Sequence, residues 1–466
     1  MHYHALACDY DGTLAPEGTI LPETRAALQR LRDTGRHVLL VTGRRLEDLQ
    51  QVCPDLSVFD AIVSENGAVY TKPSVPTPRL LAPAPPQAFF DRLRARGVTP
   101  LDRGGVIVAT VQPHETEVMD AIRELGLELQ VIFNKGAVMV LPSGVNKASG
   151  LEFALTDLGL SRHEVVGVGD GENDHAFLAH CELSVAVADA VPSLAEAADI
   201  VTRGGAGVGV VQLVDALIAG DARVLTPRRP RHQIPLGTRD DATSFAVPAR
   251  DGTILCVGGD DAARSALLTH VLRRLADESY QSCVIDPAGV HGADATGKDA
   301  AVTVILGVPD RAPTIAEVVA ALAAPGRHVV ASLAALPPGE QPGFAAQLVA
   351  ALSELRERTG RPHFLVVDRA ELVWTRDSLP DGVPDGLVVA TAAPDRLPPR
   401  LLAAVSLVLS AGPGAAAGLQ AAAAPLSRQA PDAREVDLSP GEALAWPMAG
   451  KAPPFRLRIA RDTPAS

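Results

Sequence analysis

Short apolar runs that end in polar residues recur through the first half of the chain. Runs of this kind are typical of strands that are buried on both faces of a parallel sheet. They cover residues 5–8, 37–41, 60–64, 164–168 and 183–187. Between the first two, residues 22–34 place Leu28 and Leu31 on one helical face, and Gly35 follows as a C-cap. This alternation predicts an α/β fold with a Rossmann-like parallel sheet.

A proline-rich stretch interrupts the alternation. Residues 73–86 contain six prolines, which predicts a departure from the sheet. The patterns that follow are a mixture of helices and strands. Helices are expected near 87–96 and 115–125, and strands near 105–111, 127–133 and 137–141. We therefore expect an inserted α+β cap at about 78–142 that covers the sheet as a lid.

The second half of the chain predicts another α/β sheet. Its apolar runs alternate with helical patterns and cover residues 254–257, 282–285, 301–306, 328–333, 364–367, 387–391 and 405–409. The longest helix is expected at 342–359. An Ala-rich piece at 415–424 contains Gly418 and Gln420 and is expected as a loop or a weak helix.

These patterns divide the chain into four parts. A first domain is expected at 1–222 and a second α/β domain at 250–415, with a C-terminal extension at 416–466. The stretch between the domains, 223–249, contains prolines and a cluster of arginines at Arg223, Arg228, Arg229 and Arg231. We interpret it as a solvated linker, with a phosphate-binding patch as the alternative.

Composition and charge exclude several classes of protein. A chain of 466 residues favours two or three domains, and its formal charge of −13 argues against broad binding to nucleic acids or anionic membranes. The five cysteines form no C-x-x-C pair, which disfavours disulfides and thiolate zinc sites. We find no secretory signal and no apolar span of about 20 residues. We therefore expect a cytoplasmic protein without a membrane partner.

Polar residues cluster at the predicted strand ends and the helix starts beside them. Asp9 and Asp11 follow the first strand, and Thr42-Gly43 follows the second. Lys147 opens a helix, and Asp170 and Asp174 follow a later strand. Each piece alone reads equally well as a turn, a strand exit, a solvated lysine or a helix cap. Because ligands bind beyond the carboxyl ends of parallel strands, the set together indicates phosphoryl transfer.

This ordered set resembles the haloacid dehalogenase superfamily, in its Cof-like, sucrose-phosphatase-like branch, over about residues 1–220. The motifs that carry the resemblance are D-x-D-G-T, V-T-G-R, the lysine and G-D-G-x-N-D, with the cap between the second and third. The resemblance implies that Asp9 attacks phosphorus and that Asp11 protonates the leaving group and then activates water. It assigns phosphate binding to Thr42, Gly43 and Lys147.

The resemblance also implies a Mg²⁺ site and a neighbouring substrate site. The metal ligands would come from Asp9, Asp11 through its carbonyl, Asp170 and Asp174, and the substrate-proximal residues would be Arg44, Asn66 and Asn173. We expect a Mg²⁺-dependent phosphomonoester hydrolase acting through an aspartyl-phosphate, on a small phosphorylated metabolite such as a sugar phosphate. A sugar phosphomutase is the alternative, since it uses related motifs.

Residues 250–415 resemble the HerA/FtsK-like P-loop ATPases, with departures at the phosphate loop, and the resemblance implies a RecA-like α/β domain. The nucleotide loop would include Gly258, Arg264 and Ser265, with Asp368 as the metal-coordinating acid. Arg264 stands where the loop lysine would be, and Asp260 and Asp261 bring negative charge. We therefore expect a degenerate module that serves a protein partner or self-association. In the competing interpretation the chain is a nucleotide- or nucleic-acid-linked assembly protein with an accessory phosphatase-like domain.

Overall fold

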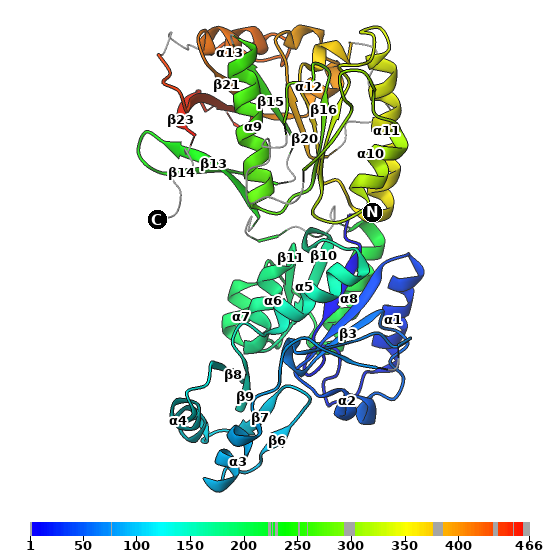
Figure 1. Ribbon diagram of the computed structural model, residues 1–466, viewed down its shortest axis with the longest axis vertical. Coiled ribbons are helices and arrows are strands. Elements are labelled where there is room, and N and C mark those ends of the chain that lie inside the picture. The colour runs from blue at the N-terminus through cyan, green and yellow to red at the C-terminus, as the bar shows by residue number, and fades with distance from the viewer. Residues whose placement is uncertain are drawn as a thin grey trace. The chain divides into compact units, whose positions relative to one another are not determined.

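The structure is a computed structural model in which the chain forms two compact units, residues 1–231 and 232–466 (Figure 1). The units are described separately. The residues described are 2–75, 77–221, 225, 227–228, 232–249, 252–258, 260–292, 303–375, 385–431, 437–450 and 452–459.

The N-terminal unit is organised around an eight-stranded sheet with the order β12-β11-β10-β1-β2-β3-β4-β5. The central strand β1 (Ala5–Cys8) lies parallel between β10 (Val165–Gly169) and β2 (His37–Val41). The remaining strands are β3 (Ala61–Ser64), β4 (Val69–Thr71), β5 (Arg79–Leu80), β11 (Leu183–Ala186) and β12 (Ile200–Val201). Strands β4 and β5 run antiparallel to their neighbours. The expected Rossmann-like α/β fold is thus confirmed for this unit.

Helices cover both faces of this sheet because successive side chains of each strand point to opposite sides. Leu6 and Cys8 of β1 pack with α1 (Pro22–Asp33) and α8 (Ala206–Gly220). Ala5 and Ala7 pack on the other side with α5 (Lys147–Leu158) and α6 (His175–His180). Two shorter helices are α2 (Leu46–Val52) and α7 (Pro192–Ala197). The carboxyl ends of the parallel strands are left for loops.

A cap is inserted between β5 and α5. Its antiparallel sheet has the order β6-β7-β9-β8, formed by β6 (Asp102–Arg103), β7 (Val108–Val111), β8 (Leu129–Asn134) and β9 (Ala137–Pro142). The helices α3 (Gln87–Ala95) and α4 (Glu115–Leu125) pack on one another, and Phe89, Leu93 and Val118 form a core with buried valines of the sheet. The cap therefore has a hydrophobic core of its own.

The second unit is built on an eleven-stranded sheet with the order β14-β13-β23-β22-β21-β15-β20-β19-β16-β18-β17. The last seven strands in this order are parallel: β21 (Val405–Ala411), β15 (Thr253–Gly258), β20 (Leu387–Ala390), β19 (Phe364–Val367), β16 (Ser282–Asp286), β18 (His328–Ser332) and β17 (Thr303–Leu306). Its helices are α9 (Asp261–Asp277), α10 (Ile315–Leu322), α11 (Gln341–Thr359), α12 (Pro399–Ala403) and α13 (Ala415–Ala423).

Two segments expected outside the second domain contribute strands to this sheet. Within the expected linker, β13 (Gln233–Arg239) and β14 (Ser244–Pro248) form an antiparallel hairpin. From the expected extension, β22 (Glu442–Pro447) pairs with β21, and β23 (Phe455–Arg458) pairs with β13. The Ala-rich piece is the helix α13, because Leu419 and Ala422 pack into the core while Gly418 lies against Gly258. Its glycine marks close packing and does not break the helix.

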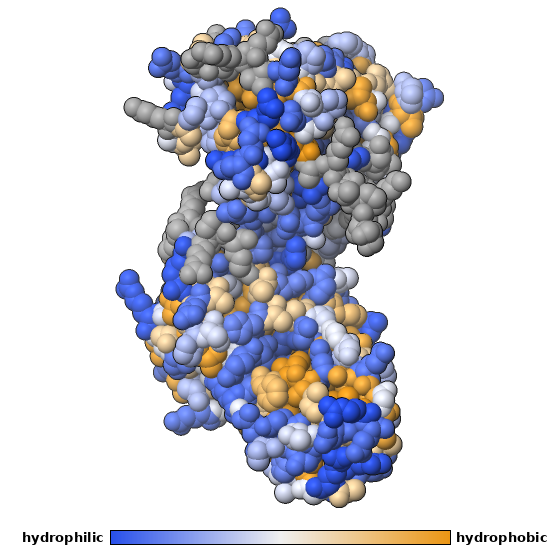
Figure 2. Space-filling model, turned by 90° about the vertical axis from the view of Figure 1, so that its left-hand side faces the viewer, coloured by the Kyte–Doolittle hydropathy of each residue, from blue (hydrophilic) through white to orange (hydrophobic). Residues whose placement is uncertain are grey.

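The surface of the described residues is predominantly hydrophilic on the face shown in Figure 2, with hydrophobic side chains gathered in one area of the N-terminal unit. Among the helices of the described residues, none combines the length and the hydrophobicity that crossing a membrane requires. All five cysteines are buried.

Candidate active site

The turn after β1 places two carboxylates at the carboxyl edge of the sheet. The Asp9 main-chain N–H continues the ladder by donating to the Val168 carbonyl at 3.0 Å, and its side chain is buried. Tyr10 points into the core. Gly12 has φ +81°, and a Cβ there would lie 2.1 Å from a carboxylate oxygen of Asp170. The glycine therefore allows the Asp9 turn and the acidic loop to approach closely.

Lys147 bridges two of the acids. It is the first residue of α5, where Asn146 and Ser149 form a capping box that fixes the start of the helix. Its Nζ donates to Asp9 Oδ1 at 2.5 Å and to Asp174 Oδ1 at 2.6 Å, and the side chain is 1% exposed. Burial alone would lower the pKa of Lys147, but the carboxylates of Asp174 and Asp9 raise it above its ordinary value. The lysine is therefore a fixed cation.

The loop after β10 holds the other two acids. Asp174 Oδ2 accepts the main-chain N–H groups of Asp170 and Gly171, each at 2.9 Å, and the Thr13 hydroxyl donates to Asp170 at 3.0 Å. Burial raises the pKa of Asp170, and burial together with the charge of Asp174 raises that of Asp9. The three carboxylates of Asp9, Asp170 and Asp174 outnumber the two ammonium groups that contact them, which belong to Lys147 and to Lys135 of the cap.

The acidic cluster fits a hard divalent cation. One carboxylate oxygen from each of Asp9, Asp170 and Asp174 lies within 4.8 Å of the others. Carboxylate oxygens are the ligands that Mg²⁺ prefers, and a bound cation would relieve the repulsion described above. The sequence prediction of an acidic site at this edge therefore agrees with the geometry of these three side chains.

Arg44 and Asp11 form a bidentate pair beside this cluster. The Arg44 Nε and Nη2 atoms donate to the two Asp11 oxygens at 2.7 Å each, and this bonding raises the pKa of Arg44. Thr42 is fully buried, and its hydroxyl accepts the Arg44 main-chain N–H at 3.1 Å. Gly43 lines the pocket next to Asp9 and Asp11. These four residues thus lie together, as their positions at two adjacent strand ends predict.

Asn66 and Asn173 are joined to each other. Asn173 Nδ2 donates to Asn66 Oδ1 at 2.9 Å, and both side chains are buried. Asn173 also lines the pocket that contains Asp9, whereas Asn66 supports it from behind. Of the three residues expected near a substrate, Arg44 and Asn173 therefore reach the pocket wall directly.

Two residues of the site are not evident from the sequence. Lys135, at the turn between β8 and β9 of the cap, contacts Asp170 through its ammonium group. Glu65 is buried next to Asn66 and binds main-chain amides of the cap. Both contacts depend on where the cap lies over the sheet, and no local pattern specifies that. Both residues lie in the stretch between the second and third motifs. That position alone does not single out their side chains.

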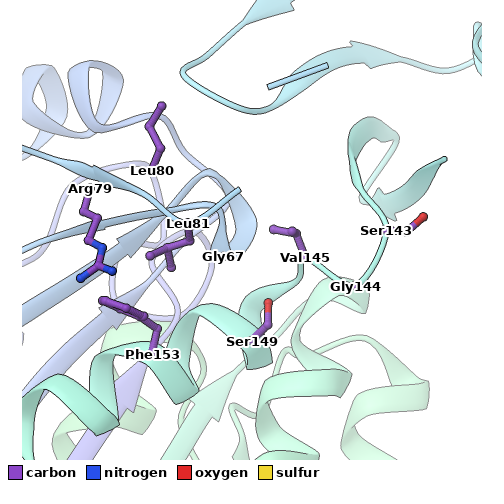
Figure 3. A pocket seen from close by; sticks show the side chains of 9 residues that line it. All are labelled: Gly67, Arg79, Leu80, Leu81, Ser143, Gly144, Val145, Ser149 and Phe153. Carbon is purple, nitrogen blue, oxygen red and sulfur yellow. The ribbon is translucent and has the colours of Figure 1, made fainter. Parts of the chain in front are cut away.

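Two pockets adjoin these elements. The first has a volume of about 230 Å³ and is lined on the sheet side by Asp9, Asp11 and Arg44, and on the cap side by residues that include Asn134 and Met139. The second, about 450 Å³, lies between the two chain segments that join the cap to the sheet. Figure 3 shows Arg79 extending over the Phe153 ring, at 4.6 Å from its centroid, with Ser143, Gly144 and Val145 across the cavity.

In the second unit, the residues of the expected nucleotide loop contact one another. The Arg264 side chain is 4% exposed and folds back to donate to the Gly258 carbonyl at 2.7 Å and to Asp261. Asp261 also pairs with Arg369 at 2.9 Å. Ser265 follows Arg264 in the first turns of α9 and is partly buried. Asp368 comes directly after β19. It is buried, and its carboxylate contacts His291 at 3.1 Å.

Comparisons with known proteins identify the N-terminal unit. A model of the haloacid dehalogenase-like hydrolase family matches residues 6–75 and 107–214. Phosphoglycolate phosphatase 2 of Saccharolobus solfataricus is 28% identical over 224 residues, covering 46% of this chain and 93% of the relative. A phosphoglycolate phosphatase of Methanothermobacter thermautotrophicus is 30% identical over 220 residues, covering 45% and 96%.

A solved haloacid dehalogenase-like hydrolase from Bacteroides thetaiotaomicron is 20% identical, with a TM-score of 0.40, and covers 46% of this chain and 98% of its own. The expected enzyme class, a phosphatase, is confirmed by the family match and the curated relatives. Through its N-terminal unit, the chain belongs to the haloacid dehalogenase-like hydrolase family.

Proposed function

We propose that the N-terminal unit hydrolyses a small phosphomonoester through an aspartyl-phosphate, with Mg²⁺ as cofactor. The observation that carries this proposal is the contact of one buried ammonium group with two carboxylates, Lys147 with Asp9 and Asp174, at the carboxyl edge of a parallel sheet. When bound at Asp9, Asp170 and Asp174, the metal supplies positive charge to the phosphoryl oxygens.

The chain's own residues divide the remaining work. An Asp9 carboxylate oxygen attacks phosphorus as the P–O bond to the alcohol breaks, and Asp11 gives its proton to the leaving oxygen. A water molecule then attacks phosphorus, Asp11 takes the water proton, and the bond from phosphorus to Asp9 breaks to release phosphate. Lys147 and the Gly43 amide stabilise the negative phosphoryl oxygens. Because Arg44 holds Asp11 by two hydrogen bonds, substrate must draw Arg44 away for Asp11 to carry a proton.

The pocket favours a small substrate. Its 230 Å³ is below the range of about 300–1,000 Å³ that is common for drug-sized ligands. The curated relatives are named for phosphoglycolate, a two-carbon phosphomonoester. We therefore propose phosphoglycolate and short sugar phosphates as the first substrates to test.

The test measures phosphate release with Mg²⁺ from phosphoglycolate and from a panel of sugar phosphates. For Asp9→Asn we expect a loss of at least about 10³-fold in kcat, because the amide cannot form the covalent bond to phosphorus. Asp48→Asn, at the pocket rim, is the matched control and should keep most of the activity. Equal rates for Asp9→Asn and the wild type would refute the mechanism, and isomerised sugar phosphate without phosphate release would favour the phosphomutase.

We further propose that the second unit is a degenerate HerA/FtsK-like module that does not hydrolyse ATP and instead serves a protein partner or self-association. Support comes from the internal contacts of its loop, since Arg264 is bound to Gly258 and Asp261, and Asp368 faces His291. A nucleotide phosphate would have to displace these contacts and approach Asp260 and Asp261 at the start of α9.

This proposal predicts that ATP with Mg²⁺ does not raise the melting temperature beyond the shift that Mg²⁺ alone produces. A ligand at 100 times its Kd would stabilise the protein by about 2.7 kcal/mol, which thermal unfolding detects readily. An additional shift with ATP that is absent in Ser265→Ala would contradict the degenerate interpretation.

A further inference from the structure

The Glu65 carboxylate is buried and binds the backbone of the cap. It follows β3, is 3% exposed, and lies in the helical turn η1 (Glu65–Gly67). Oε1 accepts the Gly105 N–H at 2.8 Å, and Oε2 accepts the Val106 and Ile107 N–H groups at 2.7 and 2.9 Å. These three amides precede β7 of the cap. One side chain of the sheet domain therefore anchors three consecutive residues of the lid.

The surroundings are shaped for this contact. A Cβ on Gly104 would lie 2.5 Å from Glu65 Oε1, so that position admits only glycine without a shift. In the turn that carries the carboxylate, φ is 51° at Glu65, 54° at Asn66 and 106° at Gly67. Three consecutive residues are therefore in the left-handed region. A non-glycine residue reaches this region only when neighbouring contacts compensate for the strain. A simple hairpin between β3 and β4 requires neither a glycine at position 104 nor three consecutive left-handed residues.

The strained segment also contacts three segments of the site: the loop after β2, the acidic loop after β10 and the start of α5. The Glu65 N–H donates to the Arg44 carbonyl and the Asn66 N–H to the Thr42 carbonyl, each at 2.9 Å. Asn66 accepts a hydrogen bond from Asn173 in the acidic loop. Gly67 lies so close to Asn146, the residue before Lys147, that a Cβ would be 1.9 Å from its carbonyl oxygen.

Apolar packing also joins the cap to the sheet domain beside this carboxylate, where Val69 packs with Val106 and Met139, but it is sparse between the two connecting segments. Leu80 and Leu81 on one segment and Val145 on the other border the 450 Å³ cavity (Figure 3). Contacts across an open space of this size hold the two segments only loosely. The carboxylate of Glu65 binds three main-chain amides of the cap at once, whereas Lys135 reaches the sheet domain through a half-exposed side chain.

We propose that Glu65 is a positioning residue that couples the placement of the cap to the arrangement of the phosphate-binding loops. The effect that we expect on catalysis rests on the phosphatase function proposed above. The structural part of the proposal, the carboxylate bound to the amides of 105–107, stands without it.

The first test is amide hydrogen exchange of the full chain. In Glu65→Gln, the side-chain NH₂ replaces one acceptor and faces main-chain donors. We expect exchange of the amides at 105–107 to become at least about tenfold faster, with the β1 and β10 amides unchanged. Glu124→Gln, a cap acid in exposed ion pairs, is the control. Unchanged exchange at 105–107 in Glu65→Gln would overturn the proposal, whether or not the protein is a phosphatase.

The second test is steady-state kinetics with p-nitrophenyl phosphate and phosphoglycolate. We expect Glu65→Gln to lower kcat and raise KM together, about 10–100-fold in kcat/KM, with the melting temperature little changed. If the role of Glu65 were purely structural, a smaller fraction of the variant protein would be active and its KM would stay constant. That result would overturn the proposed coupling. Gly104→Ala, which crowds the same carboxylate, should give the same effect, and the double variant should be no worse than either single one. Wild-type protein inactive on every phosphomonoester would refute the proposed function alone.

Discussion

Lys147 illustrates how a single buried charge organises the site. Its ammonium group is almost inaccessible to solvent and binds one oxygen each of Asp9 and Asp174. These two carboxylates have oxygens within 4.8 Å of each other, and they repel one another unless a cation lies between them. The lysine is therefore needed for the folded arrangement itself, apart from the phosphate-binding role proposed for it.

Lys147→Met removes this cation and keeps the length of the side chain. We expect the free energy of unfolding to fall by about 3–5 kcal/mol, because two buried carboxylates lose their partner. Mg²⁺ should restore more stability in the variant than in the wild type, since it supplies the missing charge. Urea unfolding with and without Mg²⁺ measures both effects. Lys72→Met, whose partner Asp157 is more exposed, should cost no more than about 1 kcal/mol, and an equal loss in the two variants would contradict the prediction.

That these polar side chains lie together was predictable because they stand at fixed places along the chain. Asp9, Thr42 and Asp170 each follow a parallel strand, and strand ends meet at one edge. Lys135 and Glu65 were not predicted, because the contacts of each join the cap to the sheet domain. Their contacts are set by tertiary packing and have no periodic or local signal.

At the scale of elements, the turn from β3 to β4 shows the limit of motif interpretation. Asn66-Gly67 predicts a hairpin turn, and β3 and β4 do pair antiparallel around it. The turn, however, adopts a run of left-handed residues and is wedged between the α5 start and the cap. The Asn-Gly pair favours the reversal of the chain, whereas the crowding depends on segments far away along the chain.

Gly67→Ala tests this crowding. Both φ and the contact of 1.9 Å with the Asn146 carbonyl oppose a Cβ. Gly35→Ala is the matched control, since Gly35 has φ +89° and a Cβ at that position would meet nothing within 4 Å. We expect the control to lose about 1–2 kcal/mol for its conformation alone and Gly67→Ala to lose clearly more, with a lower kcat because Lys147 is displaced. Equal losses in denaturant unfolding would show that the turn relaxes freely.

At the scale of the whole molecule, the two sheets differ in how well the sequence predicts them. The parallel strands of both units appear as apolar runs, since both of their faces are buried. The four strands β13, β14, β22 and β23 were missed, because their short alternating patterns lie among prolines and charged residues. Pairing between residues 238 and 458 joins segments that no local pattern connects.

The second unit carries a pH dependence that originates in one buried histidine. Burial lowers the pKa of His328 to about 4, and the Ser282 main-chain N–H points at its Nδ1, which therefore must remain unprotonated. The stability that His328 contributes is fully present above about pH 6.5 and is lost as pH falls towards 4, up to about 3 kcal/mol. His328→Asn should flatten the decline of unfolding free energy between pH 7 and 4.5, and an unchanged slope would contradict this origin.

The strand β23 has a consequence for synthesis. It lies between β22 and β13 and supplies the hydrogen bonds that join the hairpin of residues 233–248 to the rest of the sheet. While the chain emerges from the ribosome at about 5–20 residues per second, that hairpin waits for more than 200 residues, from 248 to 455, before its edge is covered. Until then it presents an unpaired edge of the kind that chaperones bind and that neighbouring nascent chains can extend. The strand β23 is thus the one that covers the β13 edge of the hairpin.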